Sequence, residues 1–343
     1  MHKQLTAFFT ALCAAAVLSA GCASKWSLIT ESPSEPRQWI DDSKTERARH
    51  VATVKGFKEA PNALKYIAFG GSGENMIVRP VAVAKGRDGR LAIADLGCAC
   101  VHLYIPSEQK YRKIYGAGEK ELRSPVGVAF DEDSRLYVSD SIKGAIFVFD
   151  RRGERLFTIK SAGYAELRRP TGLSYSYEKK ILYAVDTTAN KIYAYTSKGS
   201  LLFSFGERGE KNEQLNLPTH VTTSPDGRIY VTDAMNFRVQ VFDASGAFLS
   251  SFGHHGNGSG DFAMPKGIAV DKAGVIYVVD ALFDNVQLFN LKGDFLFTIG
   301  GQGTGQGGFW LPSGLFLDDQ NKLYVCDTYN QRVQIFQLTG NPR

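Results

Sequence analysis

Few residues of this chain combine the type and the placement that catalysis or metal binding needs. The densest group is the run Cys98-Ala-Cys-Val-His102, which lacks the Cys-x-x-Cys-His spacing of covalent haem attachment. His220 stands alone, no Gly-x-Ser-x-Gly segment marks a nucleophilic serine, and no Cys/His pair is placed as a nucleophile and its base. A catalytic triad could still form from residues that the fold brings together. The secondary-structure elements that position these residues therefore decide whether a catalytic site is expected.

A repeat of 45 to 48 residues organises most of the sequence. Each copy has a Pro that opens a short apolar strand and, about fifteen residues later, an apolar run that ends in Asp. The prolines are Pro80, Pro125, Pro170, Pro218, Pro265 and Pro312, and the aspartates are Asp95, Asp140, Asp186, Asp233, Asp280 and Asp327. A period of this length is typical of propeller blades or of helical arrays.

The segments inside each copy predict strands. The run before each Asp is β-branched and aromatic, as in Ile229-Tyr-Val-Thr-Asp233. The next run alternates apolar and polar residues, as in Arg238-Val-Gln-Val-Phe242, which is typical of a half-buried strand. A fourth run, such as residues 295–300, precedes a Gly-rich connection. Each copy therefore predicts a four-stranded antiparallel sheet, and six copies predict an all-β, six-bladed β-propeller.

The last copy stops after its third strand, at Phe336 or Gln337. We expect an N-terminal strand at residues 65–70 to complete this blade, because its Phe-Gly ending matches the other fourth strands. The predicted domains are a signal peptide at 1–21, a flexible tether at 22–62, the propeller at 63–337 and a C-terminal tail at 338–343.

Composition fits one large all-β domain. The chain has 35 Gly, 22 Phe and 15 Tyr, and 43% of its residues are hydrophobic, which is ample for a core. The net charge of +5 is modest and is spread along the chain without Lys/Arg clusters. Nucleic acid is therefore not an expected partner.

The first 22 residues indicate export. A short basic start, an apolar stretch too short to cross a bilayer and the segment Leu18-Ser-Ala-Gly-Cys22 resemble the signal and lipobox of bacterial lipoproteins. The resemblance implies lipid modification of Cys22 and a lipid-anchored place in the bacterial cell envelope. Because residue 23 is Ala rather than Asp, it favours the outer membrane, facing the periplasm or the cell surface. Residues 22–62 are rich in Ser, Pro, Glu, Lys and Arg and are expected to act as a tether.

Export leaves Cys98, Cys100 and Cys326 in an oxidising compartment, and three thiols leave one unpaired. Cys98 and Cys100 occupy the places that Asn236 and Arg238 have in the fourth copy. A bridge between Cys100 and Cys326, across the first and last blades, is one conceivable pairing. If it stays free, Cys326 lies in a buried strand and acts as a small apolar residue.

The repeats resemble the NHL family, whose pattern has a Pro-x-Gly opening, an Ile-Tyr-Val-x-Asp strand and an Asn-x-Arg-Val-Gln-Val-Phe strand. Residues 264–271 and 233–242 carry this pattern almost letter for letter. The resemblance covers residues 64–337 and implies the propeller fold, but one propeller frame serves binding scaffolds and several enzymes. Bacterial lipoproteins of this type resemble binding or assembly components.

The resemblance also implies where chemistry would lie. Amidating lyases that resemble this fold carry zinc-binding His directly after the opening Pro, whereas this chain has Val81, Val126, Thr171, Thr219, Lys266 and Ser313. His220 falls one place later, in the Gly position, and is the channel candidate. Lactonase-like propellers hold calcium on inner-strand oxygens, and the openings here carry no Glu, Asp or Asn near the Pro. We therefore expect no cofactor, no metal and no catalytic residue.

The function predicted from the sequence is a lipid-anchored, non-catalytic scaffold that binds an envelope protein. The partner-binding candidates are Lys143, Lys191, Arg238, Arg332 and Lys266, which would favour an anionic partner. For the Arg residues the alternative is structural, since Asp-x-x-Asn-x-Arg loops can tie neighbouring blades together. The alternative function is a hydrolase or lyase, lactonase-like or amidating-lyase-like, with a site in the central channel.

Overall fold

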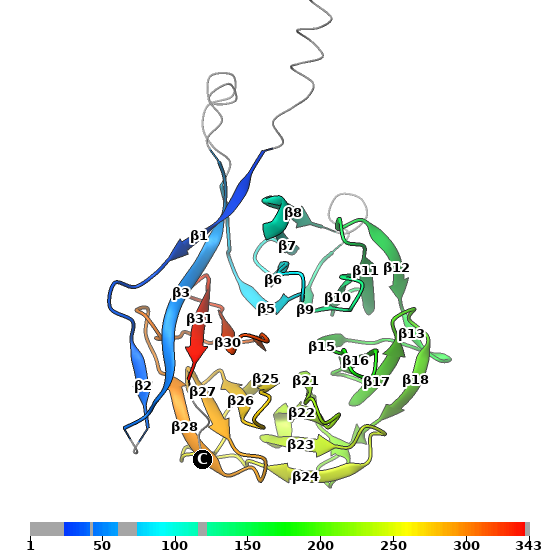
Figure 1. Ribbon diagram of the computed structural model, residues 1–343. Coiled ribbons are helices and arrows are strands. Elements are labelled where there is room, and N and C mark those ends of the chain that lie inside the picture. Colours follow the sequence, from blue (N-terminus) through cyan, green and yellow to red (C-terminus); the bar gives the residue numbers. More distant parts are fainter. Residues whose placement is uncertain (1–23, 42–43, 61–73, 116–121, 340–343) are drawn as a thin grey trace, which may run out of the picture.

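The protein is seen here in a computed structural model, which describes residues 24–41, 44–60, 74–115 and 122–339. Its sheets surround a central opening, and the chain passes from one sheet to the next around it (Figure 1). Five sheets have four antiparallel strands each, formed by consecutive segments of the chain. The propeller class predicted from the repeats is therefore confirmed.

The four-stranded sheets keep one strand order from the centre outward. The first has β5 (Pro80–Lys85), β6 (Leu91–Asp95), β7 (Cys100–Ile105) and β8 (Lys110–Ile114); the second has β9 (Pro125–Phe130), β10 (Leu136–Asp140), β11 (Ala145–Phe149) and β12 (Arg155–Ile159). The third has β15 (Pro170–Ser176), β16 (Ile181–Asp186), β17 (Lys191–Thr196) and β18 (Leu201–Phe205); the fourth has β21 (His220–Thr223), β22 (Ile229–Asp233), β23 (Arg238–Phe242) and β24 (Phe248–Phe252); the fifth has β25 (Pro265–Val270), β26 (Ile276–Asp280), β27 (Asn285–Phe289) and β28 (Phe295–Gly300). Short elements in the connections are β13 (Ser161–Ala162), β14 (Ala165–Glu166), β19 (Glu207–Arg208), β20 (Gln214–Leu215) and the 3-10 turns η1 (Pro106–Glu108) and η2 (Ala234–Asn236).

The sixth repeat departs from the predicted form, because it belongs to a seven-stranded sheet, which we call the closing sheet. This sheet contains β29 (Leu315–Leu317), β30 (Lys322–Asp327) and β31 (Arg332–Leu338), together with β1 (Trp26–Glu31), β2 (Gln38–Ile40), β3 (Glu46–Glu59) and β4 (Glu74–Met76). The prediction of six four-stranded blades is wrong in number, since five sheets have that form.

The strand that completes the closing sheet is β3, not residues 65–70. β3 pairs with β31 in antiparallel register from Ala48 opposite Leu338 to Val54 opposite Val333. β1, β2 and β4 also pair with β3 (Figure 1). The predicted strand at 65–70 lies outside the described residues. The predicted tether is wrong over the described strands of residues 26–59, because these strands belong to the sheet that also contains the C-terminal strand.

Apolar side chains pack between neighbouring sheets. One cluster joins Tyr183 and Ile192 of the third sheet to Val221 and Phe242 of the fourth. In the closing sheet, Phe57 of β3 is fully buried and stacks on Tyr111 of the first sheet with ring centroids 4.5 Å apart. The core is therefore distributed between the sheets, and β3 contributes to it.

The Asp that ends each second strand is buried and fixes the connection that leads into the inner strand of the same sheet. Asp95 accepts N–H hydrogen bonds from Val78 and Arg79 at 2.7 and 2.9 Å, and Asp280 bonds Ala263 and Met264 in the same way. These aspartates are fully buried, so the repeated Pro and Asp mark one edge of each sheet. No helix in the described part of the chain is long and apolar enough to cross a membrane.

Candidate functional site at the central channel

The innermost strands of all the large sheets line a central cavity of about 380 Å³. We name its two ends by the chain: the proline end, where inner strands begin, and the hairpin end, where they turn into the second strands. A volume of this size suits a small-molecule ligand. The two ends differ in how their charged groups are satisfied.

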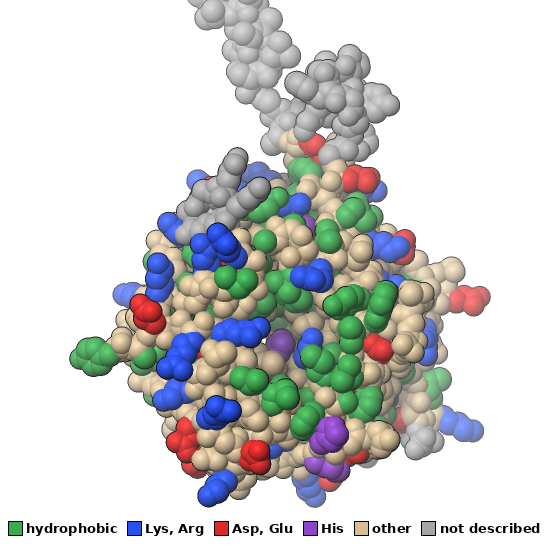
Figure 2. All heavy atoms as spheres, turned by 180° about the vertical axis from the view of Figure 1, so that it is seen from behind, with side chains coloured by type: hydrophobic (Ala, Val, Ile, Leu, Met, Phe, Trp, Pro, Cys, Tyr) green, Lys and Arg blue, Asp and Glu red, His purple; other side chains and the backbone are tan. Residues whose placement is uncertain are grey.

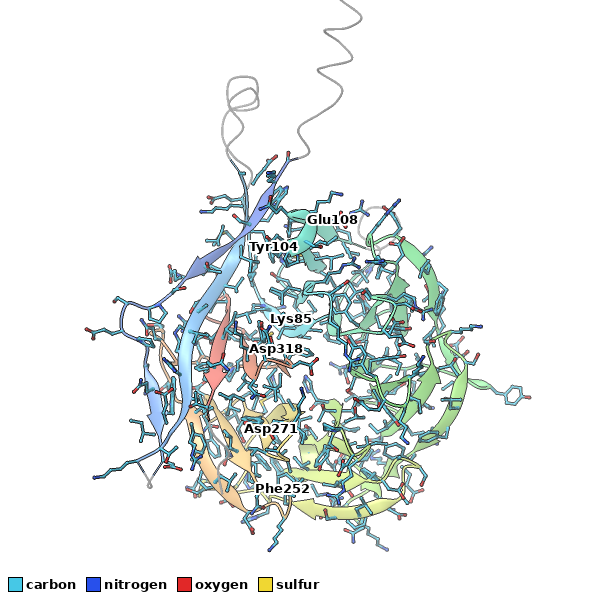
Figure 3. All side chains as sticks on the ribbon, viewed as in Figure 1. Lys85, Tyr104, Glu108, Phe252, Asp271 and Asp318 are labelled. Atoms are coloured by element: carbon cyan, nitrogen blue, oxygen red, sulfur yellow. A yellow bond between two sulfur atoms is a disulfide. The ribbon has the colours of Figure 1, made fainter. Side chains whose placement is uncertain are left out.

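At the hairpin end, charged side chains are paired. Lys85 donates a 2.7 Å hydrogen bond to Asp318, and the two lie near the centre of the ring (Figure 3). Burial alone would lower the pKa of Lys85, but the bond to Asp318 outweighs it and the pKa is raised. Arg87 lies over the Tyr177 ring at 4.0 Å from its centroid. These groups connect different sheets and are already engaged.

At the proline end, two basic groups lack a partner within the described part of the chain: the Nδ1 of His220 and the ammonium of Lys266. His220 starts β21, and its buried Nδ1 makes no hydrogen bond; Lys266 follows Pro265 in β25, and its ammonium has no ion pair among the described residues. Burial and the nearby charge of Lys266 lower the pKa of His220 to about 3, and burial lowers the pKa of Lys266. The site therefore holds a neutral imidazole beside an amine whose charge is disfavoured by burial.

The neighbouring inner strand is held against His220 by a glycine. The N–H of Gly172 donates to the Thr219 carbonyl at 3.0 Å, and a Cβ on Gly172 would lie 2.7 Å from both that oxygen and the His220 Cα. A side chain does not fit at such a separation, which explains the Gly of the Pro-x-Gly opening. His220 occupies the same position in the fourth repeat, and the buried Oγ1 of Thr219 is also without a partner.

Large apolar side chains are exposed around the proline end, and we call this set the apolar rim. Four members come two residues after a buried Asp: Ile142, Met235, Leu282 and Tyr329. The other four come one or two residues before the Pro of a repeat: Val78, Leu217, Met264 and Trp310. Figure 2 shows apolar side chains around the opening, with a histidine and cationic side chains at its centre. Sequence reasoning missed this rim, although the position two residues after the Asp signals it in four repeats.

The predicted partner-binding residues are not equivalent. Arg238 donates to Asp233 at 2.9 Å and to the carbonyls of Lys211 and Gln214, and Arg332 binds Asp327 at 2.7 Å and the carbonyls of Gly305 and Gly308. These two arginines tie a sheet to the preceding connection, and their contact with a partner stays a prediction.

The other predicted cations lie apart. Lys143 is exposed and Lys191 is half-buried, while Lys266 lies beside His220 at the channel. The structure thus brings together one partner-binding candidate and the channel candidate.

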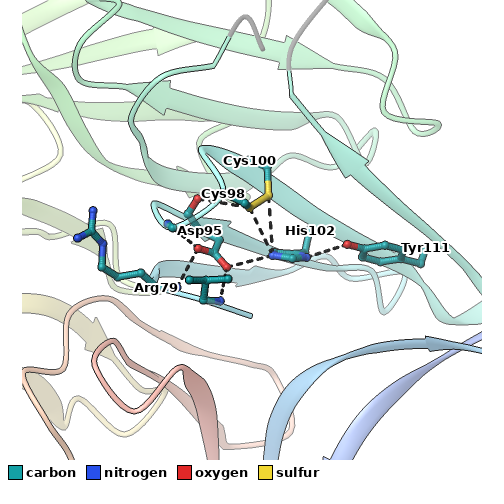
Figure 4. The surroundings of a disulfide bond; sticks show 8 residues. Arg79, Asp95, Cys98, Cys100, His102 and Tyr111 are labelled. Carbon is teal, nitrogen blue, oxygen red and sulfur yellow. Dashed lines mark hydrogen bonds and ion pairs between the residues drawn. A yellow bond between two sulfur atoms is a disulfide. The ribbon is translucent and has the colours of Figure 1, made fainter. Parts of the chain in front are cut away.

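The predicted bridge between Cys100 and Cys326 is wrong. Cys98 and Cys100 form a disulfide, and Cys326 is free and buried, with its pKa raised by burial (Figure 4). The ligand atoms of Cys98, Cys100 and His102 lie within 4.8 Å of one another. Cys22 lies outside the described residues, and its lipidation stays a prediction.

Comparisons with known proteins support the fold. A family model described as a 6-bladed beta-propeller matches residues 216–282, and the NHL-repeat model matches residues 309–336. No curated protein matched the sequence.

Solved structures similar to this chain include a lyase and a gluconolactonase. A streptogramin B lyase matches with a TM-score of 0.60 and 10% identity, covering 92% of this chain and 98% of that chain. Virginiamycin B lyase from Staphylococcus aureus also matches, in a catalytically inactive histidine-to-alanine variant with quinupristin. Its TM-score is 0.60 and its identity is 10%, and the match covers 92% of this chain and 100% of that chain. A gluconolactonase from Xanthomonas campestris matches with a TM-score of 0.62 and 15% identity, covering 91% of this chain and 96% of that chain.

The class of the protein follows from its sheets and from these matches: it is an all-β propeller. The segment at residues 309–336 matches the NHL repeat. Identities of 10 to 15% show the fold alone, so activity rests on the site.

Proposed function

We propose that the protein is a propeller enzyme of the hydrolase or lyase type that acts on an amphiphilic anion in its central channel. The observation that carries this proposal is the buried, unsatisfied Nδ1 of His220 beside the half-buried Lys266, whose ammonium has no ion pair among the described residues. Buried polar groups are normally satisfied, as Lys85 and Asp318 are at the hairpin end. The unsatisfied nitrogen of His220 and the ammonium of Lys266 are therefore available to a ligand.

The chemistry follows from the pKa values. A carboxylate placed beside Lys266 would favour its charged form and raise the pKa of His220 from about 3. The ligand would thus convert a very weak base into an effective one, which accepts a proton either from water or from a carbon next to a carbonyl. The apolar rim would hold the hydrophobic part of the same molecule.

The structural neighbours favour this enzymatic function over the scaffold hypothesis. They include a lyase and a gluconolactonase, and a histidine-to-alanine variant of virginiamycin B lyase is catalytically inactive. The scaffold hypothesis also relied on Arg238 and Arg332, whose donors are engaged within the protein. An envelope protein that binds through Lys143 and Lys191 stays a separate proposal.

The test uses decanoate and decanol as matched probes. Calorimetry should show that Lys266→Met weakens decanoate binding at least tenfold and leaves decanol binding unchanged, while the exposed control Lys143→Met changes neither. Equal decanoate affinity in wild type and Lys266→Met would refute the anion site.

Turnover is tested with 2-hexyl-5-oxooxolane-3-carboxylate, a lactone that also carries a carboxylate and an alkyl chain. Hydrolysis adds the mass of one water, whereas elimination gives an isomer of unchanged mass, so chromatography separates this isomer from the substrate before mass spectrometry. We expect His220→Asn to bind decanoate and to lose turnover. Turnover that persists in His220→Asn would remove the histidine from the mechanism.

We further propose that the closing sheet acts as the sixth blade and that Cys22 carries the lipid that anchors the protein in the envelope. The fold model described as 6-bladed supports the first statement, and the residues before Cys22 support the second. Metabolic labelling with an alkynyl fatty acid should mark the wild type and not Cys22→Ala; a label on both would exclude Cys22 as the site.

A further inference from the structure

The first sheet differs from the others at three positions that follow its buried Asp. In the fourth sheet, the residues three, five and seven places after Asp233 are Asn236, Arg238 and Gln240. Their donors bind the carbonyls of the preceding connection at 2.9, 2.7 and 2.6 Å. These side chains are structural ties between a sheet and the connection before it.

In the first sheet, the same three places after Asp95 hold Cys98, Cys100 and His102. The side chains contact one another instead of a neighbouring carbonyl: the two sulfurs are bonded, and His102 Nε2 lies 3.9 Å from each (Figure 4). A disulfide between residues two apart closes a very short loop, and the chain-entropy gain from a cross-link grows with loop length. Stabilisation of the fold is therefore a weak reason for this disulfide.

The two sulfurs are unequally accessible. Cys98 is half-buried, whereas Cys100 and His102 are fully buried. Thiol–disulfide exchange needs one sulfur that an external thiol can reach and one that leaves as a thiolate. The geometry assigns these roles to Cys98 and Cys100, respectively.

His102 is positioned to support the leaving sulfur. Its Nε2 lies 3.1 Å from Asp95 Oδ2, its Nδ1 lies 2.9 Å from the Tyr111 hydroxyl, and its ring stacks on Phe57 at 5.3 Å. Burial lowers the pKa of His102 even though Asp95 favours the protonated ring, so the imidazole is neutral beside the disulfide. A thiolate formed at Cys100 would favour the imidazolium.

We propose that Cys98 and Cys100 form a thiol–disulfide exchange site. A partner thiol, as thiolate, attacks Cys98 Sγ, a mixed disulfide forms, and the Cys98–Cys100 bond breaks with its electron pair on Cys100 Sγ. The proton lost by the attacking thiol is taken up by His102, which leaves a thiolate–imidazolium pair. A second thiol attacks the mixed disulfide and releases the partner disulfide; Cys98 leaves as a thiolate, takes up the proton of that thiol, and the dithiol remains. In the reverse direction the dithiol reduces a partner disulfide with the same balance.

The experiment uses the full chain and oxidised glutathione as the probe. Cys100→Ser should accumulate one glutathione on Cys98, located by peptide mass mapping, and Cys98→Ser should leave Cys100 unmodified. His102→Gln, which carries the residue of the fourth sheet, should slow reduction of the native disulfide by dithiothreitol at least tenfold. A thermal midpoint unchanged in His102→Gln separates this loss from unfolding.

Three results would overturn the proposal. Reduction no faster than global unfolding, with no glutathione on Cys98, would make the disulfide structural. Equal modification of Cys98 and Cys100 in the two serine variants would remove the assigned roles. Stoichiometric binding of Zn²⁺ to the reduced protein that blocks exchange with glutathione would make Cys98, Cys100 and His102 a metal site instead.

Discussion

Replacement of Phe57 by Ala tests whether the N-terminal strand β3 is part of the folded ring. Phe57 is fully buried, in a cluster that includes Val54 of β3, Val83 and Ile93 of the first sheet. Its ring stacks on His102 at 5.3 Å and on Tyr111 at 4.5 Å. Truncation of such a residue removes its transfer free energy and leaves a cavity between two sheets, so we expect a loss of about 3–5 kcal/mol in the free energy of unfolding.

The assay is urea denaturation followed by tryptophan fluorescence, because Trp26 and Trp39 both lie on strands that pair with β3. The matched control is Ile40→Ala: this residue lies on β2 and is 57% exposed, so its replacement should change the free energy of unfolding by less than about 0.5 kcal/mol. If Phe57→Ala behaves like the control, residues 46–59 are a tether after all, and the closure of the ring by β3 is refuted.

Three further predictions follow from the buried polar groups. Arg332→Ala should lower the free energy of unfolding by about 3–5 kcal/mol in the same denaturation assay, since it leaves Asp327 buried without its cation; Arg151→Ala, at an exposed position, is the control, and equal effects would contradict the role of the tie. His220 has a folded pKa of about 3, below the unfolded value of about 6.5, so its contribution to stability is complete above pH 6.5 and falls as the pH is lowered. Between pH 7 and 5 the free energy of unfolding of wild type should fall by about 2 kcal/mol more than that of His220→Gln. Parallel curves of this free energy against pH would contradict the prediction. Burial and Arg332 lower the pKa of His50 to about 4, so His50 also destabilises the fold when the pH falls from 7 to 5. His50→Gln should therefore reduce the loss of free energy of unfolding over this pH range by a similar amount, measured from the urea midpoint at each pH. An unchanged pH dependence would show that His50 can be protonated in the folded protein without this cost.

The repeated segments could be predicted from the sequence because their patterns are local. The run that ends in each Asp was predicted as a strand, and the example at residues 229–233 is a strand with those bounds. The Pro and the Asp of each copy mark the edge where the chain turns, since the Asp carboxylate binds the N–H groups before the Pro. Short-range hydrogen bonds of this kind leave a clear signature in sequence.

Closure and the site depend on contacts that a linear pattern does not encode. The Phe-Gly ending of residues 65–70 matched other fourth strands, but the charged segment around Arg47 and Arg49 pairs with β31, because tertiary pairing overrides a polar composition. Cys100 and Cys326 lie in blades that adjoin, yet Cys98 is close enough to Cys100 to form the bond instead. The sequence cannot show that Lys266 lacks an ion pair among the described residues, because this depends on where the neighbouring carboxylates lie in space.

The pairing of β3 with β31 also sets a condition on biosynthesis. Ala48 meets Leu338 across this pair, so one of the first strands to be made must wait for the last. Contacts between such distant parts of a chain form slowly, and until the C-terminal strand arrives the backbone groups of β3 are open to other strands. A chain that ends a few residues early would keep that edge exposed, and would be removed by proteolysis or aggregate rather than persist as a slightly shorter ring.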